Sequence, residues 1–391
     1  MRNPPIDFDD LDVAALRESP GEKWALYPAD VLPAWVADMD LPVAAPIRRV
    51  LRRSVDRSYL GYPVNPRPQD LPTLFAARAR ERYGWKLRPG RVEVITDVVQ
   101  GIYVALQQFA QRGEGVVFQT PIYPPFFDAV RETQRRAVES PLVAGAAGYE
   151  IDFDELRASL DPGTRILLLS HPHNPTGRVF TRSELEALAE LAVERDLLIV
   201  SDEIHADLVF SGHTHIPIAT LGPEVEQRTL TLMSASKAFN SAGLRCAVAA
   251  CGSDALARRF NELPRHTRGG INALGLAATD AAWRHAQPWL DRALRHLEAN
   301  RDFAAAFLAE RLPQVRCFPP EATYLAWLDC RALGLSPSPY EFFLEHARVA
   351  LSDGRRFGKT GEGFVRLNFA TSRAILTDAL ERMARAVDAR A

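Results

Sequence analysis

The sequence predicts an α/β protein with a mostly parallel sheet in a large domain and a smaller α+β domain beside it. Between about residues 90 and 252, six short apolar runs of β character alternate with helical patterns, which is typical of a sheet covered on both faces. From about residue 285 the order changes to one long helix, then strands, then a last helix. The 391 residues, 47% of them hydrophobic, can bury one large core or two unequal ones.

The strands of the large domain are predicted from apolar runs bounded by polar or turn residues. They cover residues 92–96, 115–120, 165–170, 197–202, 229–234 and 246–251. One intervening helix is clear over residues 181–196, where Ser183 can cap the first turn. Its buried face is predicted from helical spacing and comprises Leu185, Leu188, Leu191 and Ala192.

The smaller domain is predicted from a different succession of elements. A long helix over residues 285–312 precedes a terminal helix and three strands, at 323–329, 348–352 and 364–370. The Pro-rich first 45 residues contain no convincing core strand, so we expect them to wrap onto one of the two domains. The predicted division is a large domain over 46–284 and a small domain formed by 1–45 and 285–391.

Charge and hydropathy exclude several classes of function. The 49 acidic and 47 basic residues give a formal net charge of -2 without a long basic stripe, which argues against a nucleic-acid partner. No apolar run approaches the roughly 20 residues needed to cross a bilayer, and the start of the chain lacks a signal-peptide pattern. Four cysteines in or beside apolar segments favour reduced, buried thiols. We therefore expect a cytoplasmic protein that binds small molecules and neither nucleic acids nor membranes.

Lysine is rare in this chain, which makes one lysine conspicuous. Only four of the 47 basic residues are lysines, namely Lys23, Lys86, Lys237 and Lys359. Lys237 stands in "SASK", directly after the apolar run "TLTLM". A guanidinium does not deprotonate in proteins and cannot form an imine, whereas an amine can. The position therefore indicates a chemical need for an amine.

Four polar clusters follow predicted strands, where ligands of open α/β sheets bind. They are "TDVVQGIYVAL", "SHPHNPTGR", "SDEIH" and "SASK". Each also has a structural explanation, because Asn-Pro-Thr-Gly is a common turn, Asp-Glu often caps a helix and a single lysine is usually solvated.

Together the four clusters match the needs of pyridoxal 5'-phosphate (PLP). Its aldehyde needs an amine, its ring nitrogen needs a carboxylate, and its phosphate needs hydrogen-bond donors. Lys237 supplies the amine and Asp202 the carboxylate. The phosphate donors are predicted to be Ser234, Ser236, Arg245 and the backbone N–H groups at the helix start near Val99, Gln100 and Gly101.

The chain resembles the fold-type I PLP-dependent enzymes of the class I/II aminotransferase superfamily over essentially its whole length. The ordered motifs "NPTG", "SDE", "SxSK" and "VRLN" carry that resemblance. A closer resemblance is to the cystathionine β-lyase-like, or C–S β-lyase, branch. It rests on "WVADMDLPVAAPI" (35–47), "TPIYPPFF" (120–127), "HPHNPTGRVF" (171–180), "SDEIHADLVFSGHTHIPI" (201–218), "SKAFNSAGLR" (236–245) and "SDGRRFGKTGEGFVRLNFA" (352–370).

The resemblance implies a role for each matching residue. Lys237 would hold the cofactor and move protons, and Asp202 would bond the pyridine nitrogen. Asn174 would donate a hydrogen bond to the ring hydroxyl, and Tyr123 would lie along the ring face. Tyr62 would reach the phosphate of a second subunit, which implies a homodimer.

Arg366 has an argument of its own from the strand pattern. In "FVRLNFA", Phe364, Arg366 and Asn368 share one face of the strand, and the alternate residues share the other. A planar cation is thus presented from a sheet whose far face is core. The resemblance assigns Arg366 to the substrate α-carboxylate as a bidentate clamp, and the alternative is a surface arginine.

Two histidine patterns bear on the type of enzyme. Many aminotransferases carry a tyrosine three residues after the aspartate. This chain has His205 there, as the β-lyase branch tends to have, and His205 is counted among the cofactor-binding residues. His171 and His173 lie two apart, as do His213 and His215, a spacing that could bind a metal. No acidic or cysteine ligands accompany these pairs, so we expect no metal site.

The predicted reaction is β-elimination from L-cystathionine, L-cysteine or an S-substituted cysteine, which gives pyruvate, ammonia and a thiol. The nearest alternative is a PLP-dependent aminotransferase of an α-amino acid, which shares the early steps. A non-catalytic binding protein and a relative that couples decarboxylation or oxidation are further alternatives. Residue patterns do not determine which group leaves from Cβ.

Overall fold

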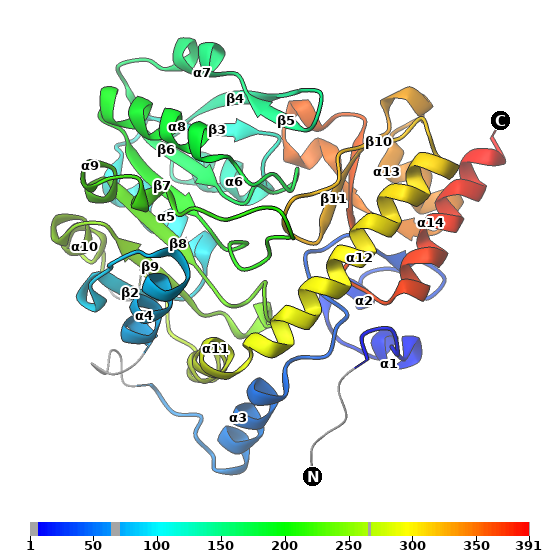
Figure 1. The fold of residues 1–391 in the computed structure, drawn as a ribbon, viewed down its shortest axis with the longest axis horizontal. Helices are drawn as coiled ribbons and strands as arrows, with labels where there is room; N and C mark the ends of the chain where they lie inside the picture. The colour runs from blue at the N-terminus through cyan, green and yellow to red at the C-terminus, as the bar shows by residue number, and fades with distance from the viewer. Residues whose placement is uncertain (1–6, 64–70, 265–266, 391) are drawn as a thin grey trace.

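The computed structural model of the chain describes residues 7–63, 71–264 and 267–390. The larger part of the molecule is built around an eight-stranded sheet with helices on both faces. A four-stranded antiparallel sheet lies next to the long helix α12 (Gln287–Arg311) (Figure 1). The predicted boundaries between two domains, at residues 46 and 285, stay a prediction.

The large sheet has the strand order β2-β9-β8-β7-β6-β3-β4-β5. Strands β8, β7, β6, β3 and β4 run parallel to one another, whereas β9, β2 and β5 pair antiparallel with their neighbours. The strands are β2 (Val92–Ile95), β3 (Gly115–Thr120), β4 (Arg136–Ala144), β5 (Tyr149–Ile151), β6 (Thr164–Ser170), β7 (Leu198–Asp202), β8 (Thr229–Met233) and β9 (Ala247–Cys251).

Successive residues of the central strands pack into two separate cores, one on each face of the sheet. Val116 and Phe118 join the cluster that contains Ile102 of α5 (Val98–Phe109). Val117 points the other way and joins the cluster that contains Leu185 of α8 (Arg182–Glu194). This alternation explains why these strands are apolar at every position. The first face also carries α6 (Pro124–Glu132) and α10 (Asp254–Phe260), and the second carries α7 (Phe153–Ser159).

The smaller sheet has the order β10-β11-β14-β13. Its strands are β10 (Arg316–Cys317), β11 (Leu325–Asp329), β13 (Ser352–Asp353) and β14 (Phe364–Asn368). Helix α12 packs beside the terminal helix α14 (Arg373–Asp388). The other helices are α1 (Val13–Arg17), α2 (Glu22–Ala25), α3 (Ala45–Asp56), α4 (Leu71–Tyr83), α9 (Pro223–Gln227), α11 (Ala273–His285) and α13 (Pro339–Phe342).

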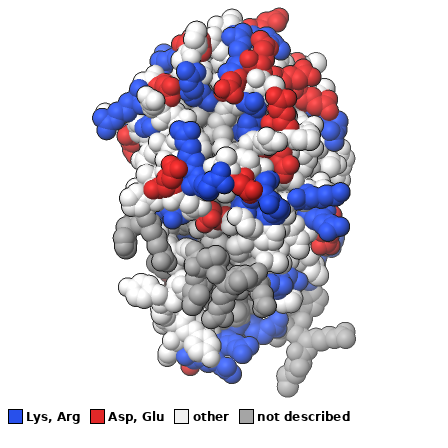
Figure 2. Space-filling view, turned by 90° about the vertical axis from the view of Figure 1, so that its left-hand side faces the viewer, with Lys and Arg blue, Asp and Glu red and all other residues white. Residues whose placement is uncertain are grey.

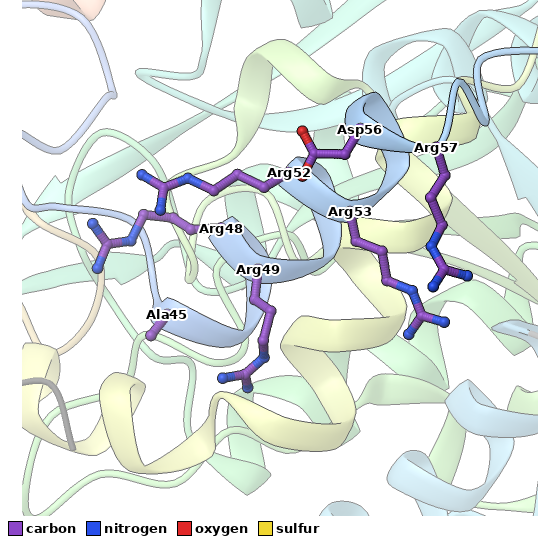
Figure 3. A pocket seen from close by; sticks show the side chains of 7 residues that line it. All are labelled: Ala45, Arg48, Arg49, Arg52, Arg53, Asp56 and Arg57. Carbon is purple, nitrogen blue, oxygen red and sulfur yellow. The ribbon is translucent and has the colours of Figure 1, made fainter. Parts of the chain in front are cut away.

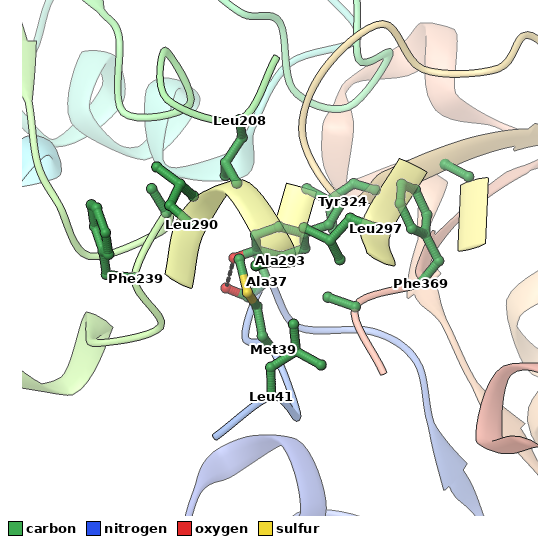
Figure 4. Packing of buried hydrophobic residues seen from close by; sticks show 14 of the residues in the cluster. Ala37, Met39, Leu41, Leu208, Phe239, Leu290, Ala293, Leu297, Tyr324 and Phe369 are labelled. Carbon is green, nitrogen blue, oxygen red and sulfur yellow. Dashed lines mark hydrogen bonds between the residues drawn. The ribbon is translucent and has the colours of Figure 1, made fainter. Parts of the chain in front are cut away.

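The N-terminal segment links the two sheets. Strand β1 (Leu32–Pro33) pairs with β12 (Val349–Ala350), and residues 37–41 then cross the inner side of α12, where Figure 4 shows Ala37 and Met39 beside Ala293. The Asn240 side chain, in the loop after β8, donates hydrogen bonds to the carbonyl oxygens of Met39 and Leu41 at 3.0 and 2.8 Å. The segment therefore contacts both parts of the molecule, and not one alone as the sequence suggested.

All six strands predicted for the large sheet are confirmed, but β4 and β5 were missed. Both lie toward one edge of the sheet, and β4 alternates buried and partly buried residues around Pro141, with exposed residues at both ends, instead of forming an apolar run. The predicted cap of α8 was wrong. Thr181, not Ser183, caps the helix, because its side chain and that of Glu184 form a reciprocal capping box. The predicted strand over 348–352 is divided between β12 and β13, which belong to different sheets.

The surface shows both signs of charge. Figure 2 shows basic and acidic side chains interspersed over the upper part of one face. None of the helices in the described ranges combines the length and the apolarity that crossing a bilayer requires.

Candidate active site

The four polar clusters meet at one edge of the large sheet. Strands β6, β7 and β8 are parallel, so their carboxyl ends bring Asn174, Asp202 and Lys237 to the same side. Strand β2 is antiparallel to β9, which is antiparallel to β8, so Asp97 after β2 also lies at this edge. The placement agrees with the rule that ligands of open α/β sheets bind beyond the carboxyl ends.

Lys237 presents a partly buried amine without an ion pair among the described residues. Its Nζ donates to the carbonyl oxygen of Ala37 at 2.8 Å. Burial lowers the pKa of the Lys237 amine, and the nearby carboxylate of Asp38 opposes this shift. By contrast, Lys23 forms an ion pair with Asp40 at 2.9 Å. The lowered pKa favours the neutral amine that imine formation requires.

Asp202 is a buried carboxyl at the end of β7. One of its oxygens accepts a hydrogen bond from the backbone N–H of Ile204 at 3.0 Å. Burial raises the pKa of Asp202 to about 7, and no cation of the described residues forms an ion pair with it. A cationic ligand group beside this carboxyl would offset the cost of burying its charge.

Arg366 is a buried guanidinium, 4% exposed, without a carboxylate partner in the described part of the chain. It donates to Asn174 Oδ1 at 2.8 Å, Ser352 Oγ at 3.2 Å and the Trp35 carbonyl oxygen at 3.3 Å. Its Nε has no partner among these residues, and burial lowers the pKa of Arg366 to about 10. The group lies 4.8 Å from the centre of the Phe357 ring. Such a cation fits an anionic ligand and is not a surface arginine.

The start of α5 shows which of its backbone N–H groups are already paired. The N–H of Gln100 donates to Asp97 Oδ1 at 2.8 Å, and the N–H of Gly101 donates to the Asp97 carbonyl at 3.1 Å. The N–H groups of Val98 and Val99 have no acceptor within the described residues. The free helix-start donors are thus Val98 and Val99, and the sequence named only the second. The buried side-chain amide of Gln100 also lacks a partner there.

Three further predicted donors lie close to this helix start or to Lys237. Arg245 forms an ion pair with Asp97 at 2.6 Å, which holds its guanidinium beside the first turn of α5. The hydroxyl of Ser234 donates to the carbonyl of Cys246 at 2.6 Å and accepts from the backbone N–H of Ser236. Ser234 therefore shapes the loop, whereas the Ser236 hydroxyl has no partner among the described residues.

The remaining predicted residues separate into two groups. Tyr123 lines a cavity together with Arg366, and His205 is buried, with its Nδ1 unpartnered within the described residues. Burial lowers the pKa of His205 to about 3, so its imidazole is neutral. Tyr62, in contrast, is fully exposed and is not part of this site in its own chain.

Sequence reasoning missed several groups that complete the site. The carbonyl oxygen of Ala37 accepts from Lys237 and also from the Tyr324 hydroxyl at 2.7 Å. Trp35 contributes its carbonyl and Ser352 its hydroxyl to Arg366. The motif "WVADMD" was the available signal for the segment, but a backbone carbonyl has no residue signature.

A cavity of about 360 Å³ opens above Arg366. Its lining comes from the N-terminal segment, the start of α6, helix α13, and strands β13 and β14 with the segment between them. It includes Tyr27, Trp35, Tyr123, Tyr340, Arg356 and Arg366. A pocket of this size, lined by aromatic and polar side chains and by the buried Arg366 cation, suits a small organic acid.

A buried pair behind Asp202 holds the turn that carries it. Glu203 Oε2 lies 2.8 Å from His215 Nε2, and Glu203 Oε1 accepts from the Ser201 hydroxyl at 3.0 Å. Burial raises the pKa of Glu203 to about 8 and lowers that of His215 to about 3, so the pair shares one proton without net charge.

Replacing Glu203 by alanine should lower the free energy of unfolding by about 2–4 kcal/mol, because it leaves the Ser201 hydroxyl and a His215 nitrogen buried and unpaired. Urea unfolding of the two proteins measures this difference. Glu203→Gln keeps an acceptor in place and should lose less. Equal stability of all three proteins would contradict the structural role.

The two predicted histidine pairs have other neighbours in the structure. No group of three or more His, Cys, Asp or Glu side chains in the described ranges could hold a metal ion. His171 lies with its ring centre 4.6 Å from that of His215, and His173 Nδ1 is 2.8 Å from the Thr176 hydroxyl.

A second hollow lies along α3 and shares no lining residue with the cavity above Arg366. Figure 3 shows five arginine side chains spread along this helix, none of which forms an ion pair within the described residues: Arg48, Arg49, Arg52, Arg53 and Arg57. The structure thus gathers basic residues locally, although the sequence showed no long basic stripe.

Comparison with known proteins assigns the chain to a family. Residues 36–383 match the family described as aminotransferase class I and II. The chain belongs to this family. It is 37% identical over 357 residues to cystathionine beta-lyase PatB of Bacillus subtilis, which covers 90% of this chain and 92% of that protein. A cystathionine beta-lyase of Corynebacterium glutamicum is 35% identical over 365 residues, covering 93% and 95%.

A solved structure gives the same assignment. The PLP-bound C–S lyase of Staphylococcus hominis has a TM-score of 0.90 at 30% identity and covers 98% of this chain and 99% of that one. The predicted fold class, the α/β fold of fold-type I PLP-dependent enzymes, is confirmed.

The described residues fit PLP, the cofactor of this family. They offer a free amine at Lys237, an unpaired buried carboxyl at Asp202, and open N–H groups at Val98 and Val99. The unpartnered Gln100 amide lies at the same helix start. The aldehyde of PLP requires an amine, its ring nitrogen requires a carboxyl, and its phosphate requires hydrogen-bond donors.

Proposed function

We propose that this protein is a PLP-dependent carbon–sulfur β-lyase that cleaves L-cystathionine, L-cysteine or an S-substituted cysteine to pyruvate, ammonia and a thiol. The observation that carries the chemistry is one site that combines a free amine, a buried carboxyl and a buried guanidinium without a counterion. Similarity to two cystathionine beta-lyases over at least 90% of the chain supports elimination as its outcome.

Each of the three groups has a distinct task in this proposal. When bound, PLP supplies an electron sink for the bonding electrons at Cα. Lys237 would hold the cofactor through its amine, and the same amine, when free, would take the Cα proton. Asp202 keeps the ring nitrogen protonated. Arg366 binds the α-carboxylate and so orients the Cα–H bond toward Lys237. As the thiolate leaves from Cβ with the C–S bonding electrons, the electrons of the former Cα–H bond would form a Cα=Cβ bond, and one water would hydrolyse the resulting enamine to pyruvate and ammonia.

The other site residues position these groups. The side-chain oxygen of Asn174 accepts a hydrogen bond from Arg366, and the Asn174 NH₂ group would donate to the ring hydroxyl of the cofactor. Tyr123 would lie along the cofactor ring, and His205 is a neutral side chain near Lys237. Ser236 and Arg245, with the N–H groups of α5, bind the phosphate.

Elimination is tested by incubating the purified protein and PLP with cysteine thioethers in the absence of a keto acid. The expected products are pyruvate and free thiol in equal amounts. Alanine lacks a leaving group and should give no pyruvate catalytically. If alanine or aspartate with a keto acid turned over faster than every thioether, the aminotransferase alternative would replace the lyase.

Replacing Arg366 by lysine should raise KM for the amino-acid substrate at least about tenfold, because an ammonium cannot reproduce a bidentate bond to a carboxylate. Steady-state kinetics with one thioether measures the effect. Arg52→Lys, at an exposed arginine outside the cavity, is the control. An unchanged KM would exclude Arg366 from substrate binding.

A homodimer is also proposed. Among the described residues, four of the seven exposed large hydrophobic side chains lie between residues 55 and 62: Val55, Tyr59, Leu60 and Tyr62. Covering them with a second copy would bury this patch and bring Tyr62 to the partner's phosphate. Sedimentation should therefore show a dimer, and a monomer at micromolar concentration would contradict it. The cytoplasmic location stays a prediction.

A further inference from the structure

The cavity above Arg366 contains a second cation for which the proposed reaction has no task. Arg356 lines the cavity, is exposed, and forms no ion pair within the described part of the chain. The adjacent Arg355 points to other partners, since it bonds Asp353 at 2.8 Å and Glu341 at 3.1 Å. Two neighbouring arginines thus differ, and only Arg356 offers a free guanidinium to the cavity.

Arg356 belongs to the same wall as the α-carboxylate site. It precedes Phe357, whose ring lies 4.8 Å from the Arg366 guanidinium. Besides burial, the positive charge of Arg356 contributes to the lowered pKa of Arg366. The two guanidiniums therefore act on one space, with Arg366 at its buried base and Arg356 at its exposed mouth.

The rest of the lining leaves Arg356 available for an anion. Two of the acidic residues that line the cavity, Asp128 and Asp353, are already paired with Arg131 and Arg355. Glu22 is the third and has no ion pair in the described ranges.

Aromatic residues form part of the wall of the cavity that both arginines line. The ring centres of Tyr27 and Trp35 are 5.8 Å apart, and the Tyr27 and Tyr340 hydroxyls are 3.3 Å apart. A substituent that packs on these rings and ends in an anion matches a cavity lined by aromatic residues and an unpaired guanidinium.

We propose that Arg356 is a specificity-determining residue that binds a carboxylate on the S-substituent of the substrate. The inference rests on the proposed function, because it places the α-carboxylate on Arg366 and lets the substituent extend from sulfur toward the mouth. A thioether with two carboxylates then neutralises both guanidiniums, whereas a neutral substituent leaves Arg356 in water. The favoured substrate class is cysteine thioethers with an anionic substituent.

The test compares two thioethers of nearly equal size, S-(2-carboxyethyl)-L-cysteine and its amide, S-(2-carbamoylethyl)-L-cysteine. Wild-type enzyme should prefer the carboxylate in kcat/KM by about fivefold, the upper range for one partly solvated ion pair. Arg356→Gln should reduce the ratio to about one. Arg52→Gln removes an unpaired exposed guanidinium from the other hollow and should keep the wild-type ratio.

A binding measurement separates this inference from the proposed function. Calorimetry of the PLP-loaded protein with 3,3'-thiodipropionate and with its monoamide needs no turnover. The dicarboxylate should bind about fivefold tighter to wild type, and Arg356→Gln should remove that difference. Unchanged kinetic and binding ratios in Arg356→Gln would overturn the role of Arg356. Absence of pyruvate from every thioether, with the binding difference intact, would overturn only the lyase reaction.

Discussion

Replacing Lys237 by alanine should reduce turnover by about 10²–10⁴-fold or more, the range for losing a positioned acid–base group. The variant loses both the amine that holds the cofactor and the base that takes the Cα proton. It should still fold and bind PLP without a covalent bond, because the side chain makes one hydrogen bond, to the Ala37 carbonyl, and no ion pair in the described structure. Single-turnover assays and the absorbance spectrum of the purified variant measure both effects.

Borohydride reduction of the wild-type protein followed by peptide mapping identifies the lysine that holds PLP. The label is expected on Lys237, and Lys86→Ala, at an exposed lysine, is the matched control. The scarcity of lysine makes the outcome clear, since only Lys23, Lys86 and Lys359 compete. A label on any of these three would contradict the assignment.

The sequence was sufficient to predict the residues at the edge of the large sheet. Asn174, Asp202 and Lys237 each follow an apolar strand, and parallel strands bring such positions together without any knowledge of loop geometry. Arg366 could be predicted as an inward cation from the alternation in β14. Its environment could not, because Ser352 and Trp35 come from segments that pair with it only in the folded chain.

Long-range backbone contacts and local capping explain what the sequence did not reveal. Ala37 lies 200 residues before Lys237 and acts through a carbonyl that every residue possesses. At α5, the Asp97 side chain takes the N–H of Gln100, which moves the free donors to Val98 and Val99. Such a change of one or two residues depends on cap geometry and not on residue type.

Replacing Asp202 by asparagine should lower turnover by about 10²–10³-fold, as expected when a charge that stabilises the reacting system is removed. Asparagine keeps a side-chain oxygen that can accept from the Ile204 N–H, so the turn should persist. What is lost is the negative charge that keeps the ring nitrogen protonated. Turnover of a thioether at saturating PLP measures the effect, and Asp152→Asn, at the cap of α7, is the control for a capping aspartate.

The cofactor-free protein gives a second readout of Asp202 that needs no turnover. Its folded pKa of about 7 lies above the unfolded value of 3.8, so its contribution to stability is present below about pH 4 and is lost as pH rises through 7. The Asp202→Asn variant does not lose stability in this way. Its free energy of unfolding, relative to that of wild type, should therefore rise by up to about 4 kcal/mol between pH 4 and pH 8. Bound PLP should cancel the gain, because its protonated ring nitrogen compensates the carboxylate of the wild type. A variant with nearly wild-type turnover and no such pH-dependent difference would mean that Asp202 only anchors the turn.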